Sequence, residues 1–142
     1  MRHRWLIFLS IILGAVVATW ICRRVGSAVR GVPDAYARWD AGEILIDHLR
    51  QHDNRWPDGW ESLRPSYDRL AAENRLRGGL TFDELRSRVR IDWTADPHAA
   101  LRDVRPFRAV EVVSGNLLTW EGADPNEMVM DYLPRNRQAV LK

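Results

Sequence analysis

The longest apolar run of the chain lies close to its N-terminus. Eighteen residues from Trp5 to Cys22 contain no charged side chain. At 1.5 Å per residue, a helix of that length covers about 27 Å, close to the ~30 Å hydrocarbon core of a bilayer. Trp5 and Trp20 lie near its two ends, where indole rings favour the headgroup level. We therefore predict an N-terminal transmembrane anchor over residues 1–30, with residues 5–22 in the lipid bilayer.

A cleaved signal peptide is the main alternative to an anchor. Such a peptide has an apolar stretch of about 7–15 residues, followed by small residues at the cleavage site. Here Trp20 and Ile21 follow the small residues, and Arg23 and Arg24 come directly after the run, which is a stop-transfer pattern. We therefore expect the segment to remain uncleaved. A buried helix of a globular domain is disfavoured because the run is apolar on every side.

The orientation of the anchor is almost balanced. Arginines collect on the cytoplasmic side of a span; Arg2 and Arg4 precede the run, and Arg23, Arg24 and Arg30 follow it. This count favours a cytoplasmic domain by one arginine. A leading anchor followed by a single domain nevertheless commonly exports that domain, and we expect the exported side. The single cysteine can form no internal disulfide and does not indicate a compartment.

Beyond the anchor, apolar positions recur every three or four residues from about residue 34 to residue 52, the spacing of an amphipathic helix. Its buried stripe is expected to consist of Ala35, Trp39, Gly42, Ile46 and Leu49, widened on one side by Ile44 and Leu45. Asp53 and Asn54 end this helix, and a turn rich in helix-breaking residues follows.

Four further helices are predicted from spacing and capping residues. They cover about 61–77, 82–86, 96–103 and 124–133. The first is interrupted or restarted at Pro65, and the second follows a capping box formed by Thr81 and Glu84. The last is expected to end early at Pro134.

The period changes to two in the segments between the later helices. Val89, Ile91 and Trp93 alternate with polar residues, which predicts a half-buried strand. Residues 107–113 and 117–120 are strand candidates joined by a hairpin signal. The fold class is therefore α+β: an N-terminal transmembrane helix, then helices and a small antiparallel sheet of about three strands. Residues 31–142 are expected to form a single small α+β domain.

Charge is distributed unevenly between these two parts. Residues 1–30 hold five arginines and no acid, whereas the rest of the chain holds 16 basic and 19 acidic side chains. A nucleic-acid-binding domain presents an excess of basic side chains to phosphate. The predicted domain has no such excess, so we expect no nucleic acid partner.

His48 and His52 are the candidate metal ligands. Four residues apart on a helix, their imidazoles share one face, as a zinc pair requires, with His98 or a carboxylate as a possible third ligand. The HExxH motif is absent, and two surface histidines can have this spacing by chance. No nucleophile elbow or phosphate-binding loop occurs either. We therefore assign no catalytic residue and expect no cofactor.

Trp56 and Trp60 flank a Pro-Asp-Gly turn. Turns lie at the surface, and tryptophan is enriched at the energetic centre of protein interfaces, so these two rings are candidate partner-binding residues. The alternative is that both rings fold back and hold the turn against the helices. One ring can also do both, with one edge packed and the other presented.

Together these patterns predict a single-pass membrane-anchored protein whose domain binds or positions a protein partner at the membrane surface. Such a domain would be non-catalytic. The alternative is a membrane-tethered, metal-assisted hydrolase that uses His48 and His52. A third interpretation is a carrier that encloses a lipid or small molecule in an apolar pocket.

Overall fold

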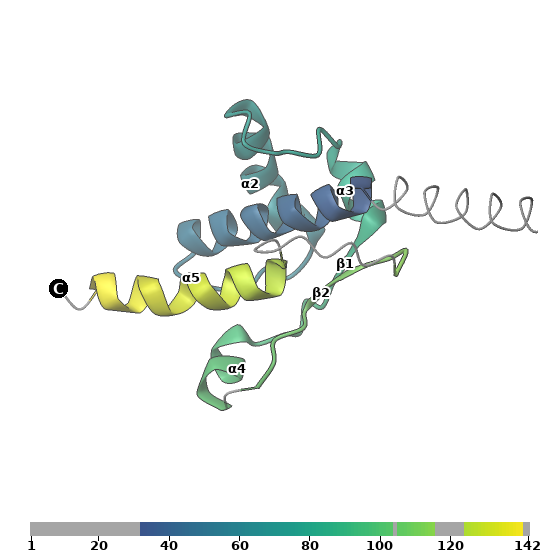
Figure 1. Ribbon diagram of the computed structural model, residues 1–142. Coiled ribbons are helices and arrows are strands. Elements are labelled where there is room, and N and C mark those ends of the chain that lie inside the picture. Colours follow the sequence, from purple (N-terminus) through teal and green to yellow (C-terminus); the bar gives the residue numbers. More distant parts are fainter. Residues whose placement is uncertain (1–31, 104, 116–123, 141–142) are drawn as a thin grey trace, which may run out of the picture.

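A computed structural model describes residues 32–103, 105–115 and 124–140 (Figure 1). The predicted membrane span over 5–22 and the predicted strand over 117–120 lie outside these ranges. No helix within them combines the length and the apolar character needed to cross a membrane.

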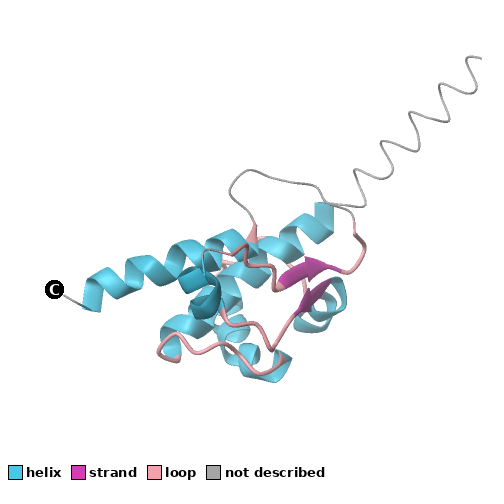
Figure 2. Cartoon of the chain, turned by 90° about the horizontal axis from the view of Figure 1, so that it is seen from below, coloured by secondary structure: helices cyan, strands magenta, loops and turns pink. Residues whose placement is uncertain are grey.

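The described residues form helices and a short two-stranded sheet that lies toward one side of them (Figure 2). The helices are a long helix over residues 32–51, α2 (Trp60–Ala72), α3 (Phe82–Arg88), α4 (Pro97–Asp103) and α5 (Pro125–Val140). The strands β1 (Val89–Ile91) and β2 (Val110–Val112) are antiparallel, with Arg90 opposite Glu111. The predicted α+β class is therefore confirmed, with two strands in the part of the chain that is described.

Local signals account for several helix ends. Thr81 Oγ1 accepts a hydrogen bond from the Glu84 N–H at 3.3 Å, and the Glu84 carboxylate accepts one from the Thr81 N–H at 2.8 Å, so the predicted capping box is confirmed. The long helix stops before Asp53 and Asn54, whose φ angles of 52° and 62° are left-handed. Aspartate and asparagine adopt this conformation more readily than other non-glycine residues.

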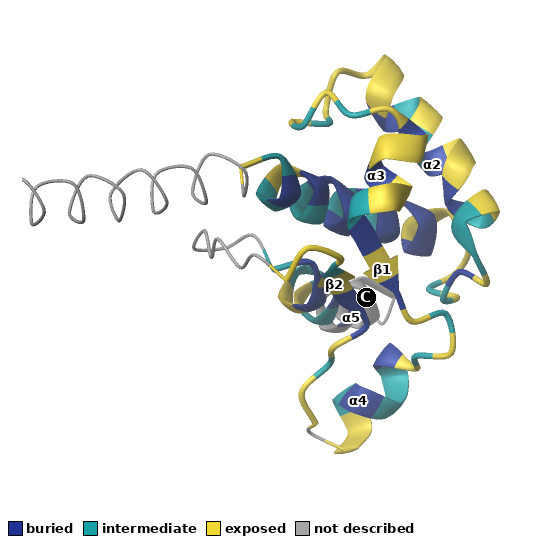
Figure 3. Ribbon diagram, turned by 90° about the vertical axis from the view of Figure 1, so that its right-hand side faces the viewer, coloured by how far each residue is buried: buried dark blue, intermediate teal, exposed yellow. Residues whose placement is uncertain are grey.

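The long helix lies at the centre of the fold and is buried along most of its length, whereas α2 and α3 expose their outer sides (Figure 3). Its most deeply buried apolar side chains are Ala37, Ala41, Ile44, Leu45 and Leu49. The predicted stripe was wrong in part: Ala35, Trp39 and Ile46 are only partly buried. The helix is covered from several directions, so its burial is set by neighbours far away in the sequence and not by one apolar stripe.

Helix α5 runs alongside the long helix in the same direction (Figure 1). The two helices approach closely at Gly42, where a Cβ atom would lie 2.8 Å from Met128 Sδ and 3.2 Å from Pro125 Cα. Glycine permits this approach because it has no side chain. The Pro134 prediction was wrong, since α5 continues to Val140. A proline removes one N–H donor and crowds the carbonyl four residues earlier, but helix on both sides of it can persist despite this cost.

Two other predicted boundaries change. Pro65 lies inside α2 without interrupting it, and α2 ends at Ala72 instead of near residue 77. Asn74 has a left-handed φ of 54°, which turns the chain away from the helix axis. Strand β2 covers three residues of the seven expected over 107–113.

Candidate functional site

Asp40 is a buried carboxylate on the long helix. It accepts hydrogen bonds from the backbone N–H groups of Arg77 and Gly78, both at 2.8 Å. Burial raises the pKa of Asp40, while these two N–H donors and the Arg77 guanidinium lower it. The carboxylate therefore fixes the loop between α2 and α3 against the long helix.

Other charged side chains of the long helix connect it to further elements. Asp34 accepts hydrogen bonds from Arg88 Nη1 at 2.9 Å and from Ser114 Oγ at 2.7 Å, which joins α3 and the turn after β2. Within the described ranges, further ion pairs from this helix to distant elements are Asp47–Arg69, Arg38–Asp124 and Glu43–Arg75. These charged groups hold neighbouring elements against the long helix, and they were not predicted from the sequence. The sequence did contain one indication of their burial: Asp40 and Asp47, seven residues apart, share a helix face with the apolar Ile44.

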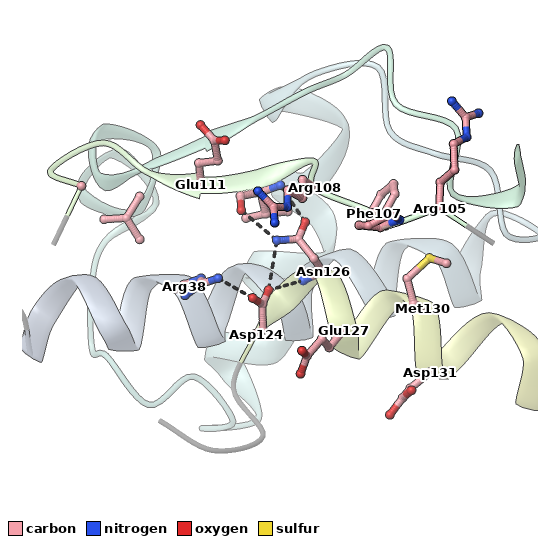
Figure 4. Close-up of a pocket in the computed structure, with 14 residues that line it drawn as sticks. Arg38, Arg105, Phe107, Arg108, Glu111, Asp124, Asn126, Glu127, Met130 and Asp131 are labelled. Atoms are coloured by element: carbon pink, nitrogen blue, oxygen red, sulfur yellow. Dashed lines mark hydrogen bonds and ion pairs between the residues drawn. The ribbon is translucent and has the colours of Figure 1, made fainter. Parts of the chain in front are cut away.

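Asn126, in the first turn of α5, is bound to the edge of β2 (Figure 4). Its Oδ1 accepts from the N–H groups of Ala109 and Val110 at 2.8 and 2.9 Å, and its Nδ2 donates to the Val110 carbonyl at 3.0 Å. The side-chain amide thus pairs with Val110 as a neighbouring strand would. Asn126 therefore attaches α5 to the sheet.

A groove of about 860 Å³ lies between the extended segment 105–112 and the beginning of α5 (Figure 4). Its lining includes charged side chains of both signs, among them Arg38, Arg108, Glu111 and Asp124. Arg38 is paired with Asp124. The groove therefore differs from the apolar pocket that a lipid carrier would need.

The two predicted metal ligands lie together on the long helix and the turn after it. The rings of His48 and His52 are stacked, with centroids 4.1 Å apart and an interplanar angle of 16°. His48 Nδ1 lies 3.1 Å from the Ser62 carbonyl oxygen, and His52 Nδ1 lies 2.9 Å from the His48 carbonyl oxygen. Each Nδ1 therefore carries the proton and donates it. Burial, followed by the neighbouring His52, lowers the pKa of His48.

This arrangement limits what the pair can bind. The lone pair of an imidazole nitrogen lies in the ring plane, so the lone pairs of two stacked rings lie in nearly parallel planes and do not converge on one point between them. A shared ion would require one ring to rotate. His98, one of the possible third ligands, lies with Nε2 3.1 Å from the Asn54 carbonyl oxygen. Within the described ranges, no three histidine, cysteine or acidic side chains are grouped to hold a metal.

Both predicted partner-binding tryptophans fold back against the domain. Trp56 Nε1 donates a hydrogen bond to the Asp92 carbonyl at 3.0 Å, and its ring meets Phe107 edge to face at 5.5 Å. Trp60 meets Trp93 edge to face at 5.6 Å. Both rings remain partly exposed, so they pack against the domain and still present surface.

Four partly exposed aromatic residues therefore form a continuous set, which we call the aromatic band: Phe107, Trp56, Trp93 and Trp60. The hydrogen bond from Trp56 to Asp92 joins its two halves, because Asp92 and Trp93 are neighbours in the chain. Trp93 did not stand out in the sequence, where it reads as the end of a strand. Edge-to-face contacts of this kind hold the rings in fixed orientations.

A comparison with known proteins finds no matching family model, no similar curated protein and no similar solved structure.

Proposed function

We propose that this chain is a single-pass membrane-anchored protein whose α+β domain binds a protein partner through the aromatic band. The apolar segment over 5–22 supplies the anchor. The single observation that supports partner binding is the arrangement of Trp56, Trp60 and Trp93 as neighbouring, partly exposed rings held in place by contacts within the domain.

Binding through rings that are already ordered costs little conformational entropy. A side chain that becomes fixed on binding loses conformational entropy of about 0.5–1.5 kcal/mol. Trp56 is held by its hydrogen bond to Asp92, and Trp60 by its edge contacts with Trp93 and Phe82. Tryptophan is also the residue most enriched at interface hot spots. A partner that covers the band would therefore gain apolar contact without ordering it.

Site-specific photo-crosslinking in intact membranes tests this proposal. A photoreactive residue is placed at Arg55 or at Glu61, which are exposed and adjoin Trp56 and Trp60. The control position is Ala72, exposed at the other end of α2, twelve residues and about 18 Å along the helix from Trp60. We expect the same adduct from the photoreactive residue at Arg55 and at Glu61, and no adduct from Ala72.

Trp60→Phe in the crosslinking background provides the second arm. The smaller ring preserves an aromatic side chain against Trp93 but removes part of the exposed surface, so we expect the adduct yield to fall several-fold. No adduct from Arg55 and Glu61, or an equal adduct from Ala72, would contradict partner binding by the aromatic band.

A further inference from the structure

Three large hydrophobic side chains are more than one-third exposed among the described residues: Val32 at 37%, Tyr36 at 38% and Val113 at 54%. Val32 and Tyr36 lie one turn apart at the beginning of the long helix, and Val113 lies in the turn after β2. Both segments lie at the same end of the molecule (Figure 1).

Hydrogen bonds hold these two segments together. Ser114, next to Val113, donates its hydroxyl to the Asp34 carboxylate at 2.7 Å. Arg88 donates Nη1 to the same carboxylate at 2.9 Å, and its carbonyl accepts the Val113 N–H at 2.9 Å. The exposed apolar side chains therefore belong to one preformed surface, which we call the proximal end: Val32, Tyr36 and Val113.

The chain itself indicates what covers this surface. Nine residues separate Cys22, the last residue of the predicted span, from Val32. Fully extended, a connection of that length reaches about 30–35 Å. Arg23, Arg24 and Arg30 lie within it, and cationic side chains near a span are attracted to anionic headgroups. Because this connection leads directly to Val32, we expect the end of the long helix that contains Val32 to be the part of the domain nearest to the bilayer.

We propose that the proximal end docks on the lipid bilayer surface, with the long helix pointing away from it. This inference rests on the membrane anchor of the proposed function. Tyrosine favours the headgroup level of a bilayer, and the two valines add apolar surface beside it. Asp34, a carboxylate at this end, is paired with Arg88 and so does not present an unbalanced negative charge to the headgroups.

Docking at the proximal end separates the membrane from the aromatic band. Strand β1 begins next to Arg88 and leads to Asp92, four residues and about 13 Å further along the extended chain. Asp92 is where Trp56 attaches. Gln51, at the other end of the long helix, is about 28 Å from Val32 along the axis. The aromatic band therefore stays accessible above the membrane while the proximal end is covered.

Lipid-quenching measurements on the full chain test the docking. The protein is reconstituted into phosphatidylcholine vesicles containing a minority of phosphatidylglycerol, in a Cys22→Ser background. A fluorophore is attached to Val113→Cys, or to Gln51→Cys as the matched control; both positions are exposed. Lipids with a headgroup nitroxide should quench the label at Val113 several-fold more than the label at Gln51. Val32→Glu should remove most of this difference while the protein remains vesicle-bound.

Each outcome has a defined meaning. If the labelled protein does not float with the vesicles, the anchor is wrong, and docking is wrong with it. If the protein floats but both labels are quenched equally, the docking is wrong and the anchor stands. If the Val113 label is shielded from an aqueous quencher but not quenched by the nitroxide lipid, another protein or a second copy covers the proximal end, and the proposal is overturned.

Discussion

Asp40 and Gly78 are joined by a hydrogen bond of 2.8 Å between the carboxylate Oδ2 and the backbone N–H, although they are 38 positions apart in the sequence. Oδ1 of the same carboxylate accepts the Arg77 N–H. The contact is close, because a Cβ atom at Gly78 would lie 2.8 Å from Asp40 Oδ2. The buried carboxylate therefore uses both of its oxygens, and each accepts a hydrogen bond from one loop N–H group.

Asp40→Asn should lower the free energy of unfolding by about 1–3 kcal/mol. The amide keeps one acceptor oxygen but turns an NH₂ group toward a backbone N–H that loses its partner. Urea unfolding of the full chain in detergent micelles measures the change. Glu43→Gln is the control, because Glu43 forms a partly exposed ion pair with Arg75, and such pairs contribute at most about 1 kcal/mol. Equal losses in the two variants would contradict the role of Asp40.

Gly42→Ala should destabilise the domain by about 1–2 kcal/mol, because the added methyl group meets Met128 Sδ and the backbone at Pro125. The methionine side chain can move, but the α5 backbone can do so only by shifting the helix. The gain in helix propensity of about 0.5–1 kcal/mol does not offset this. Thermal unfolding of Gly42→Ala measures this loss of stability. Gly59→Ala is the control, since a Cβ at Gly59 meets nothing within 4 Å. A Gly42→Ala variant as stable as the wild type would show that α5 packs less closely.

The buried His48 should make stability depend on pH in a defined direction. Its pKa in the folded state lies below the ordinary value of 6.5, chiefly because of burial. The unfolded state therefore binds the proton more readily, so the stability contributed by neutral His48 is present above pH 6.5 and is lost as the pH falls below it. The slope approaches at most about 1.4 kcal/mol per pH unit for one proton.

His48→Gln tests this dependence, because glutamine can still donate to the Ser62 carbonyl and does not titrate. Unfolding measured at several pH values should show a smaller loss of stability below pH 6.5 in this variant than in the wild type. His98→Gln, the same substitution at a histidine that lies against the Asn54 carbonyl, is the matched control. An unchanged profile in His48→Gln would mean that another group causes the loss.

The elements that could be predicted from sequence are those set by neighbouring residues. Thr81 and Glu84 cap α3 through bonds that span three positions, and Asp53 and Asn54 end the long helix through their own backbone conformations. The spacing of His48 and His52 likewise placed both rings on one face.

Features that depend on distant residues could not be predicted in this way. The buried face of the long helix is set by loops and helices that meet Asp40 and Gly42 from segments more than 30 residues away. The stacking of His48 on His52 follows from carbonyls that hold each ring, and the spacing alone does not contain this information. The joining of Trp60 to Trp93 likewise requires the sheet to bring the end of β1 beside α2.

Membrane retention of the intact chain is the property on which both proposals depend. Cells that express the full chain are broken without detergent, and their membranes are washed with alkaline carbonate. We expect the unprocessed protein to stay in the membrane pellet, and Leu13→Arg combined with Val17→Arg to release it, because each arginine at the centre of a span costs about 2.5–3.5 kcal/mol. Recovery of the unprocessed wild-type chain in the supernatant would contradict the membrane anchor and both proposals built on it.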